Sequence, residues 1–596
     1  MKSQTRFWGS PFIPPISMTL TSVAAVFVAL YAISRLFSRL VAPRSQIRDL
    51  PGPPPQSWAT GNLRQLFNAK GLRFHQSLTD VYGGIVKIYG FFGDEQLYIA
   101  DPQALQHIIL REPDAFEETA IFTEQAALFL SETDAYNFFR TNKVIFGPGL
   151  VATTGEQHAR QRRLVTPIFG VPHLRQLVPV FYRAAERLAD VLHSQASIEG
   201  QSATMDMSEW MSRVALESVG QTVLGYSFDP LDSPHNNPYT AAIKELIPTL
   251  FSLAIVRELA PFLAKIGPPS FRRKLVEWTP HNAVQRVKNM ADVMHKTAQD
   301  ILERKREEMA RDDTDDQGAR GKAKDIISIL LRANEQAKAQ NAEQLSDLEL
   351  TGQMTVLIFG AQDTTASCLS RVLYQLAQPQ HRGFQDKIRR EIQMAKLDVH
   401  SEDGVRLDYD ALGKLPILDA VLKETLRLFP PVPFVRRSVK KETLIPYVSQ
   451  CSALNSDVGG TQEMDMGVKT VRVPAGTILF MSIMGANRLE SVWGTDAKEW
   501  NPERWLEAMP SAVKLPGVFQ NMMSFLGGGR SCVGYKFALL EMKIILAVLI
   551  SRFAFSTTQD EIVWNLSQII SPSIREKMGS GLQVERKGMP LIVESL

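Results

Sequence analysis

Hydrophobic and polar residues follow the period of an α-helix along most of the chain. The pattern is clearest in residues 173–195, 283–308 and 345–378, where apolar positions recur about every three to four residues. Residues 83–102 differ, because apolar and polar positions alternate there and many side chains are β-branched or aromatic. The pattern therefore predicts a mainly α-helical protein with a small antiparallel β region.

The N-terminal region contains an apolar stretch without charge. Residues 16–34 would form a helix of nineteen residues, about 28 Å long, which is close to the hydrocarbon thickness of a bilayer. A cleaved secretory signal is the alternative, but its apolar region is usually about 7–15 residues long and no A-x-A site follows. Basic residues are more frequent after the stretch than before it, which places the C-terminal body on the cytosolic side. We therefore predict a lumenal segment at 1–15 and a transmembrane anchor at 16–36.

Three polar or proline-rich segments interrupt the pattern. Residues 37–58 are basic and then rich in proline and glycine, which predicts a stiff, non-helical hinge between the anchor and a folded body at 59–596. Residues 303–325 are dense in charge, and residues 449–468 are polar and lie between predicted strands. We predict mobile loops at both places.

Composition excludes several classes of protein. The content of 44% hydrophobic and 22% charged residues is that of an ordinary folded protein. A net charge of +3, without a long Lys/Arg block, argues against nucleic-acid binding. Cys368, Cys451 and Cys532 are far apart and form no CxxC pair, so neither a disulfide framework nor a zinc site is indicated.

Cys532 stands in the glycine-rich stretch "FLGGGRSCVG", directly before an apolar helix. Glycine allows a backbone loop to lie close to a flat ligand, and the N-terminus of the helix beginning near Val533 favours a thiolate. A thiolate suits a soft iron centre, and an arginine can neutralise a carboxylate on the same cofactor. A buried structural cysteine is the alternative. The spacing F-x-x-G-x-R-x-C-x-G is filled by Phe525, Gly528, Arg530, Cys532 and Gly534.

This decapeptide resembles the haem-binding loop of the cytochrome P450 family, the haem-thiolate monooxygenases. The resemblance implies haem b as the cofactor and Cys532 as the axial ligand of its iron. It also implies that Arg530 contacts a haem propionate, that Phe525 shields the sulfur, and that Gly528 and Gly534 permit close approach. With the further motifs below it extends from Pro51 to the C-terminus, which implies one large P450 domain behind the anchor.

A second motif is "LKETLRLFPPVP" followed by "NPERW". Glu424 and Arg427 are three residues apart and share a helix face, so they can form an ion pair. The resemblance implies that Arg504 of "NPERW" joins them in a buried structural triad. It also implies that His158, Arg162 and Arg436 contact the haem propionates, with His158 in a slot where the family often has tryptophan. His158 as an iron ligand is the alternative that we consider weaker, given Cys532.

A third motif, "LIFGAQDTTAS", places an acid and a hydroxyl in the middle of an apolar helix. A mid-helix threonine usually bonds to the carbonyl four residues earlier. The resemblance implies instead that Asp363 and Thr364 are catalytic and deliver protons beside bound oxygen. The chain has Gly360–Ala361 where the family commonly has Ala/Gly–Gly, so the groove at this point is expected to be narrower.

The resemblance implies insertion of one oxygen atom from O₂ into a hydrophobic small molecule, such as a terpenoid, a sterol or a polycyclic aromatic compound. Since no flavin or nicotinamide fingerprint is present, the electrons are expected from a membrane-bound NADPH-cytochrome P450 reductase, with cytochrome b5 as an additional candidate donor. The anchor is expected to contact membrane lipid, and the catalytic domain is expected on the cytosolic face of the endoplasmic reticulum. The general look is that of fungal microsomal members, which act in secondary metabolism or on foreign aromatics.

The substrate pocket and the reductase face can be placed only coarsely. Four basic residues could present positive charge to the reductase near the thiolate side of the haem, with ordinary solvated surface residues as an alternative of at least equal weight: Arg160, Arg163, Lys536 and Lys543. The pocket is expected to be lined by Phe138, Phe139, Phe359, Gly360, Val432 and Phe434. Two alternatives remain open: a haem-thiolate isomerase or dehydratase acting on a peroxide without O₂, and a non-catalytic haem carrier.

Overall fold

The computed structural model describes residues 46–119, 145–228, 230–232, 238–257, 274, 276–312, 325–398, 406–448, 467–507, 513–577 and 583–596. The predicted anchor at 16–36 and the predicted pocket residues Phe138 and Phe139 lie outside these ranges, as does most of the predicted loop at 449–468. Within the described ranges no helix is long and apolar enough to cross a membrane.

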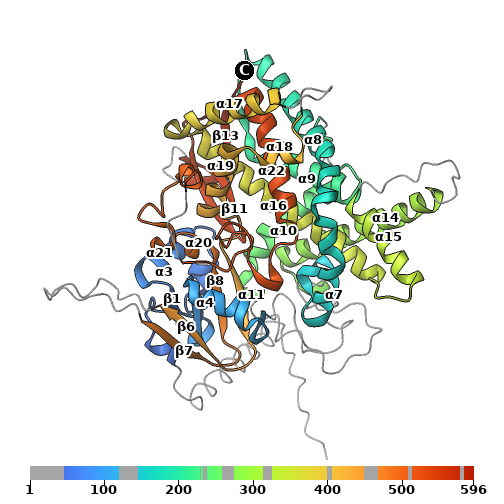
Figure 1. Ribbon diagram of the computed structural model, residues 1–596. Helices are drawn as coiled ribbons and strands as arrows, with labels where there is room; N and C mark the ends of the chain where they lie inside the picture. Colours follow the sequence, from blue (N-terminus) through green and yellow to red (C-terminus); the bar gives the residue numbers. More distant parts are fainter. Residues whose placement is uncertain are drawn as a thin grey trace, which may run out of the picture.

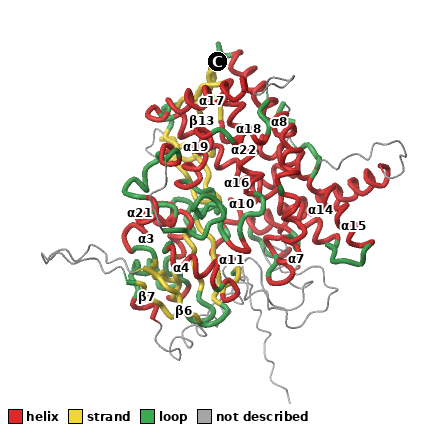
Figure 2. The backbone as a smooth tube through the Cα atoms, viewed as in Figure 1, coloured by secondary structure: helices red, strands yellow, loops and turns green. Residues whose placement is uncertain are grey.

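Helices make up most of the fold, and the strands gather in smaller groups (Figures 1 and 2). The three ranges with the clearest helical period are confirmed as helices. The longer helices are α3 (Leu72–Tyr82), α7 (Gly155–Val165), α8 (Val171–Ile198), α9 (Met207–Val219), α10 (Pro238–Ser252), α14 (Asn282–Asp312), α15 (Ile326–Ala339), α16 (Asp347–Ala377), α17 (Gly383–Asp398), α19 (Pro416–Leu428) and α22 (Tyr535–Arg552). Shorter ones are α2 (Leu63–Leu66), α4 (Pro102–Gln106), α11 (Ala254–Arg257), α18 (Tyr409–Gly413), α20 (Ile483–Ala486) and α21 (Glu490–Trp493).

The strands form four sheets with the orders β1-β2-β8-β5-β3, β10-β11-β12, β4-β13-β9 and β6-β7. Antiparallel pairing dominates, as predicted, but β2 and β8 pair in parallel, so the five-stranded sheet is mixed. The strands are β1 (Ile85–Tyr89), β2 (Glu95–Ile99), β3 (Phe116–Glu118), β4 (Ser202–Asp206), β5 (Phe434–Val439), β6 (Thr443–Val448), β7 (Val468–Val473), β8 (Ile478–Ser482), β9 (Phe553–Thr557), β10 (Glu561–Ser567), β11 (Ile569–Lys577), β12 (Gln583–Lys587) and β13 (Pro590–Ser595).

Two predicted boundaries differ from the structure. Residues 303–312 of the predicted loop at 303–325 are the end of α14, which continues four residues past the helical pattern of 283–308 and buries Lys305 and Met309. Residues 313–324 lie outside the described ranges. Residues 46–58 of the predicted hinge pack against the sheet, since Ile47 and Leu50 are buried and the carbonyl of Pro51 accepts a hydrogen bond from the Lys87 N–H of β1 at 2.8 Å. The folded body therefore begins before residue 59.

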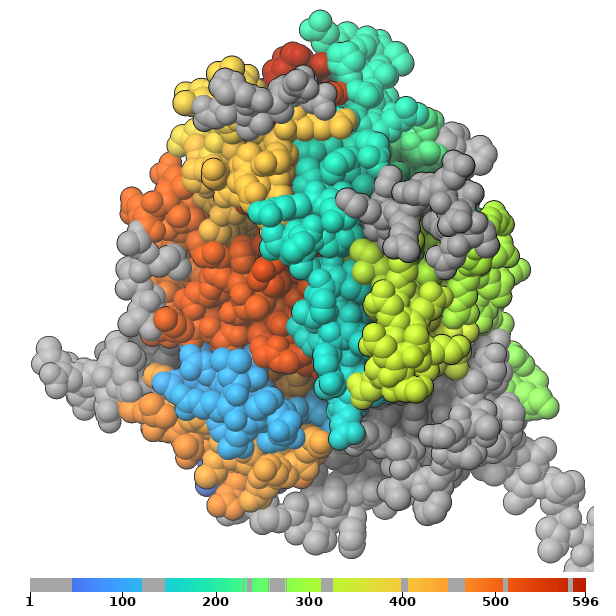
Figure 3. Space-filling view, turned by 45° about the vertical axis from the view of Figure 1, so that its right-hand side comes forward, coloured from blue at the N-terminus to red at the C-terminus, as the bar shows by residue number. Residues whose placement is uncertain are grey.

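Two helices at the centre position the site. α16 begins with a capping box, in which Ser346 and Glu349 exchange side-chain and backbone hydrogen bonds, and it contacts α9, α14, α19 and α22. α22 has apolar side chains around most of its circumference and is largely buried against α8, α17 and α16. In Figure 3 the teal residues of α7 and α8 run between the orange-red C-terminal part and the yellow-green helices. The segment that precedes α22 therefore faces α16 across the core.

Candidate active site

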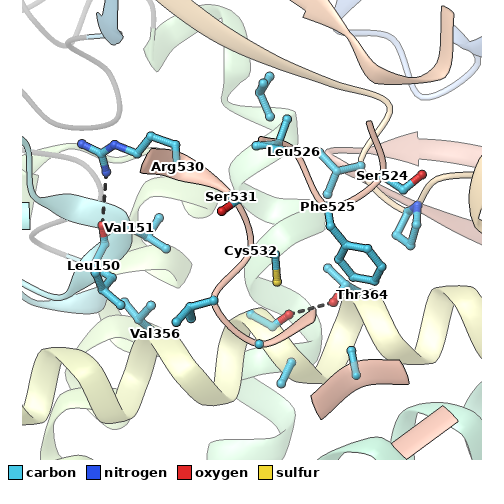
Figure 4. A pocket seen from close by; sticks show the side chains of 18 of the residues that line it. Leu150, Val151, Val356, Thr364, Ser524, Phe525, Leu526, Arg530, Ser531 and Cys532 are labelled. Carbon is cyan, nitrogen blue, oxygen red and sulfur yellow. Dashed lines mark hydrogen bonds between the residues drawn. The ribbon is translucent and has the colours of Figure 1, made fainter. Parts of the chain in front are cut away.

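A cavity of about 430 Å³ lies between α16 and the loop that precedes α22. Figure 4 shows both walls, with the Cys532 sulfur on the cavity side of the loop and the ring of Phe525 beside it. The Cys532 side chain is exposed, and the surface that it exposes lines this cavity. The walls of the cavity are mainly apolar. From α16 the cavity is lined by Val356, Leu357, Gly360, Ala361 and Thr364.

The Cys532 loop is held by hydrogen bonds on both sides of the cysteine. The Cys532 N–H donates to the Phe525 carbonyl at 2.9 Å, and Arg162 of α7 donates to the carbonyl and hydroxyl of Ser531 at 2.7 and 2.9 Å. Burial raises the pKa of the Cys532 thiol, while the Gly534 N–H and the Arg162 charge offset part of that rise. The Gly534 N–H and the Arg162 guanidinium thus act in the direction that favours the predicted thiolate.

The glycines around the cavity differ in how much space a side chain would have. Gly528 has a φ of +62°, and a Cβ atom there would lie 2.6 Å from the Ile109 carbonyl oxygen, so this glycine is required by packing within the protein. Gly534 is the N-cap residue of α22, where a Cβ would make only an ordinary contact of 3.6 Å with the Phe169 ring. At Gly360 of α16 a Cβ would meet nothing within 4 Å, which leaves the cavity face of that helix open.

Basic side chains gather at one edge of the cavity. Arg530 donates to the Thr153 carbonyl at 2.8 Å and to the Leu150 carbonyl at 3.4 Å. His158 is buried beside it, and burial together with the charges of Arg530, Arg162 and Arg437 lowers the pKa of His158 to about 3. The imidazole is therefore uncharged at neutral pH, and it can donate one hydrogen bond to a carboxylate.

Arg437 is a site residue that the sequence prediction missed. Arg436 was predicted to contact a propionate, but its guanidinium lies over the rings of Phe67 and Phe480, at 5.2 and 5.4 Å from their centroids, although the residue does border the cavity. Arg437 instead reaches the edge where His158 and Arg530 lie. Successive residues of a strand face opposite sides, so only one of the two arginines of β5 can project to that edge.

The same alternation explains part of the predicted pocket. Gly360 and Val432 line the cavity, whereas Phe434 does not. Phe434 stacks on His75 with centroids 4.8 Å apart, on the same side of β5 as Arg436. Phe359 also does not line the cavity, because its ring packs against Phe146 at 4.5 Å. Val435, which was not predicted, lines it from the other face of β5.

Asp363 and Thr364 lie on different sides of α16. The Thr364 hydroxyl donates to the Gly360 carbonyl at 2.7 Å, as a mid-helix threonine usually does, and the residue lines the cavity (Figure 4). Asp363 does not line the cavity. Burial raises the pKa of Asp363 to about 7, and the charges of Lys587 and Lys244 limit that rise. The pair thus combines a fixed hydroxyl at the cavity with an acid that titrates near neutral pH.

Glu424, Arg427 and Arg504 are brought together in the core beside the Cys532 loop. Arg427 makes a two-bond fork to the Glu424 carboxylate at 2.9 and 2.8 Å, and Arg504 donates to the same carboxylate at 3.0 Å. Both Glu424 and Arg427 are completely buried. Arg427 also donates to the carbonyls of Asn487 and Ala497, which precede the loop in the chain. The cluster therefore ties α19 to the segment leading toward Cys532.

The predicted basic surface is only partly available. Arg160 pairs with the buried Glu349, and Lys543 pairs with Asp419 at 2.8 Å and is itself mostly buried. Arg163 and Lys536 are exposed. Arg160 and Lys543 thus hold helices together, whereas Lys536 is an exposed cation and Arg163 forms a largely exposed ion pair with Glu343 at 3.8 Å.

The chemistry of the cavity fits an iron macrocycle that carries carboxylates. Within the described ranges, no cluster of three or more His, Cys, Asp or Glu side chains could hold a metal ion. Apolar walls suit such a macrocycle, and the edge formed by His158, Arg437 and Arg530 suits its carboxylates.

Comparison with known proteins agrees with this site. The family model described as "Cytochrome P450" matches residues 51–449 and 461–576. Cytochrome P450 monooxygenase 81 of Postia placenta is 39% identical over 562 residues, covering 94% of this chain and 95% of its own length. The ganoderic acid synthetase of Ganoderma lucidum is 34% identical over 566 residues, covering 94% and 97%. The chain belongs to the cytochrome P450 family and is a monooxygenase of that family, whose members bind haem through a cysteine thiolate.

Proposed function

We propose that this protein inserts one oxygen atom from O₂ into a hydrophobic small molecule, with haem b held in the cavity by Cys532. The observation that carries the proposal is the Cys532 thiol on one wall of an apolar cavity whose opposite wall carries Thr364. The bound haem iron would supply the activation of O₂, and the second oxygen atom would leave as water. Propionates would be held by Arg437 and Arg530, with His158 as a neutral donor and Arg162 fixing the loop.

Within this proposal two residues of α16, Asp363 and Thr364, deliver protons to the cavity. The Thr364 hydroxyl donates its hydrogen bond to the Gly360 carbonyl, so its oxygen lone pairs can accept a hydrogen bond from a water in the cavity. Asp363 is next to it in the chain, and with a pKa of about 7 it can both release and take up a proton at neutral pH. Proton transfer from Asp363 toward a water held by Thr364 is the role that we propose for the pair. Because Asp363 does not line the cavity, this transfer requires a turn of its side chain or a further water.

Replacing Thr364 by alanine is expected to separate oxygen use from product formation. NADPH and O₂ would still be consumed in the presence of a reductase, while product formed per NADPH would fall by at least about tenfold, because the water is no longer held. Thr364→Ser should retain the coupling. Thr355→Ala is a matched control. The Thr355 hydroxyl donates the same type of hydrogen bond, to the Thr351 carbonyl at 3.0 Å, but Thr355 does not line the cavity. Coupling that is unchanged in Thr364→Ala, or product formed without NADPH and O₂, would contradict the proposal.

The pH dependence of turnover is expected to report on Asp363. Burial raises its pKa to about 7, so the carboxyl is protonated below that pH and loses its proton above it. If the protonated form is the donor, product formation falls as the pH rises through 7. Asp363→Asn is expected to lower turnover by about 10²-fold and to remove this limb of the profile. Asp347→Asn, at the exposed start of the same helix, is the control. A limb that persists in Asp363→Asn would assign it to another group.

We propose a terpenoid, sterol or polycyclic aromatic compound as the substrate, in secondary metabolism or in the oxidation of foreign compounds. The apolar lining supports a hydrophobic ligand, and one relative is named for the synthesis of ganoderic acid. A screen of such compounds for shifts in the spin state of the haem iron is the test. Polar ligands binding better than all three classes would contradict the assignment.

The electron donor and location are part of the same proposal. We propose a membrane-bound NADPH-cytochrome P450 reductase, with cytochrome b5 as an additional donor, and a single anchor at 16–36 in the endoplasmic reticulum. Exposed Arg163 and Lys536 support a basic docking face. Removal of residues 1–36 is expected to move the protein from the membrane pellet to the supernatant after centrifugation. A full-length chain that is found in the supernatant would contradict the anchor.

A further inference from the structure

A carboxylate lies among the arginines at the edge of the cavity. Glu118 is the last residue of β3 and stands opposite Arg437 of β5 in the antiparallel register. Its Oε2 atom is 2.8 Å from Nη1 of Arg437, and its Oε1 atom is 3.9 Å from Nε of Arg530. The side chain is 16% exposed, so this ion pair is largely shielded from water. Neither the monooxygenase reaction nor the binding of haem by itself requires an acid at this place.

Glu118 stands in the wall between two cavities. A second, more polar cavity of about 240 Å³ lies beside the first, with Asp114, Glu117 and Lys440 in its lining. Glu118 is the only carboxylate among the residues that line both, within the described part of the chain. The shared wall consists of Glu118, His158, Leu526, Arg437 and Arg530.

The hydrogen-bonding capacity of the arginines is limited. Arg162 donates to Ser531, and Arg530 donates to the carbonyls of Leu150 and Thr153. The Nη1 group of Arg437 donates to the Arg436 carbonyl and also pairs with the Glu118 carboxylate. A carboxylate of the cofactor would need the same guanidinium groups that Glu118 contacts, since His158 is uncharged at neutral pH and offers a single N–H.

Charge at this edge leads to the same conclusion. Arg162, Arg437 and Arg530 carry three positive charges at the cavity, and Glu118 cancels one of them before any cofactor carboxylate is counted. A haem carries two propionates, so Glu118 would reduce the guanidinium charge left for them from three to two. At short range and away from water, this loss of attraction weakens the binding of the propionates.

We propose that Glu118 competes with a haem propionate for Arg437 and Arg530, and that its charge weakens the retention of haem and lowers the reduction potential of the iron. The inference rests on haem occupying the main cavity, as proposed above. Negative charge near the iron disfavours the added electron, so removing it raises the potential. A merely structural role, in which Glu118 holds the arginines in place for the cofactor, predicts the opposite sign for haem retention.

The test is Glu118→Gln in the holoenzyme, with Glu117→Gln as the matched control. Glu117 is adjacent on β3 and undergoes the same change of charge, but it pairs with Lys440 at 3.6 Å. Transfer of haem to excess apomyoglobin gives the rate of haem loss, and a dye-coupled titration gives the reduction potential. We expect Glu118→Gln to lose haem several-fold more slowly than the wild type and to have a higher potential, with Glu117→Gln close to the wild type.

A third variant separates charge from contact. Glu118→Asp keeps the charge, so its potential should stay near that of the wild type. Faster or unchanged loss of haem from Glu118→Gln would overturn the competition, and so would a Glu118→Gln chain that fails to fold, because either result makes the ion pair a support for the arginines. A wild-type chain that takes up no haem would overturn the proposed function itself, which the haem content of the starting protein reports separately.

Discussion

Replacing Cys532 by serine is expected to reduce turnover by at least about 10³-fold, because in the proposed function the Cys532 thiolate is the ligand through which the protein would donate electron density to the iron. Ser531 and Arg162 would still hold the loop, since their hydrogen bonds do not involve the sulfur. The Cys532 N–H also keeps its bond to the Phe525 carbonyl. The fold should therefore survive, and the loss is one of chemistry.

Cys368→Ser is the matched control for this change. Cys368 is a buried cysteine of α16 that borders the same cavity, and burial raises the pKa of its thiol to about 12. Turnover, haem content and the circular dichroism spectrum should be measured for both variants. Cys368→Ser is expected to keep most of the activity. Comparable turnover in the wild type and Cys532→Ser would show that the iron is held elsewhere, with His158 as the next candidate.

Replacing Arg427 by alanine is expected to lower the free energy of unfolding by about 3–5 kcal/mol, which is typical for a buried ion pair that loses one partner. The Glu424 carboxylate would remain completely buried with its charge only partly balanced by Arg504. The carbonyls of Asn487 and Ala497 would also lose their donor. We expect little folded holoprotein at physiological temperature.

Lys387→Ala provides the comparison at the surface. Lys387 pairs with Glu503 at 2.9 Å, one residue from Arg504, but both side chains are about half exposed. An exposed pair of this kind contributes less than about 1 kcal/mol. Urea unfolding followed by fluorescence should separate the two variants clearly. Equal midpoints for Arg427→Ala and Lys387→Ala would show that the buried cluster does not stabilise the fold.

The helical part of the fold could be predicted because its signal is local. The period of apolar residues placed α8, α14 and α16, and the last residues of α14 were assigned to a loop because charged residues outnumber apolar ones there, although Met309 is buried. The packing of Ile47 and Leu50 on β1 could not be predicted, since it depends on a sheet whose position is set by distant residues. The parallel pairing of β2 with β8 has the same origin.

The site shows the same division between local and distant information. Glu424, Arg427, Thr364 and Cys532 are fixed by motifs whose spacing determines which side chains share a helix face or a loop. The side chains of β5 could not be placed from the sequence. Strand alternation links Val435 with Arg437 and Phe434 with Arg436, but the sequence does not tell which pair projects into the cavity. Phe434 was therefore predicted to line the cavity although it does not, and Arg437 was missed. Glu118 was missed because only strand pairing brings it to Arg437.

The carbon monoxide difference spectrum of the reduced protein tests the central claim most directly, since it reports the axial ligand of the haem iron. With Cys532 as a thiolate ligand, the wild-type protein should show the strongly red-shifted Soret band of a haem thiolate, and Cys532→Ser should lose that band. A wild-type spectrum without the red shift in a folded, haem-containing sample would contradict the assignment of Cys532.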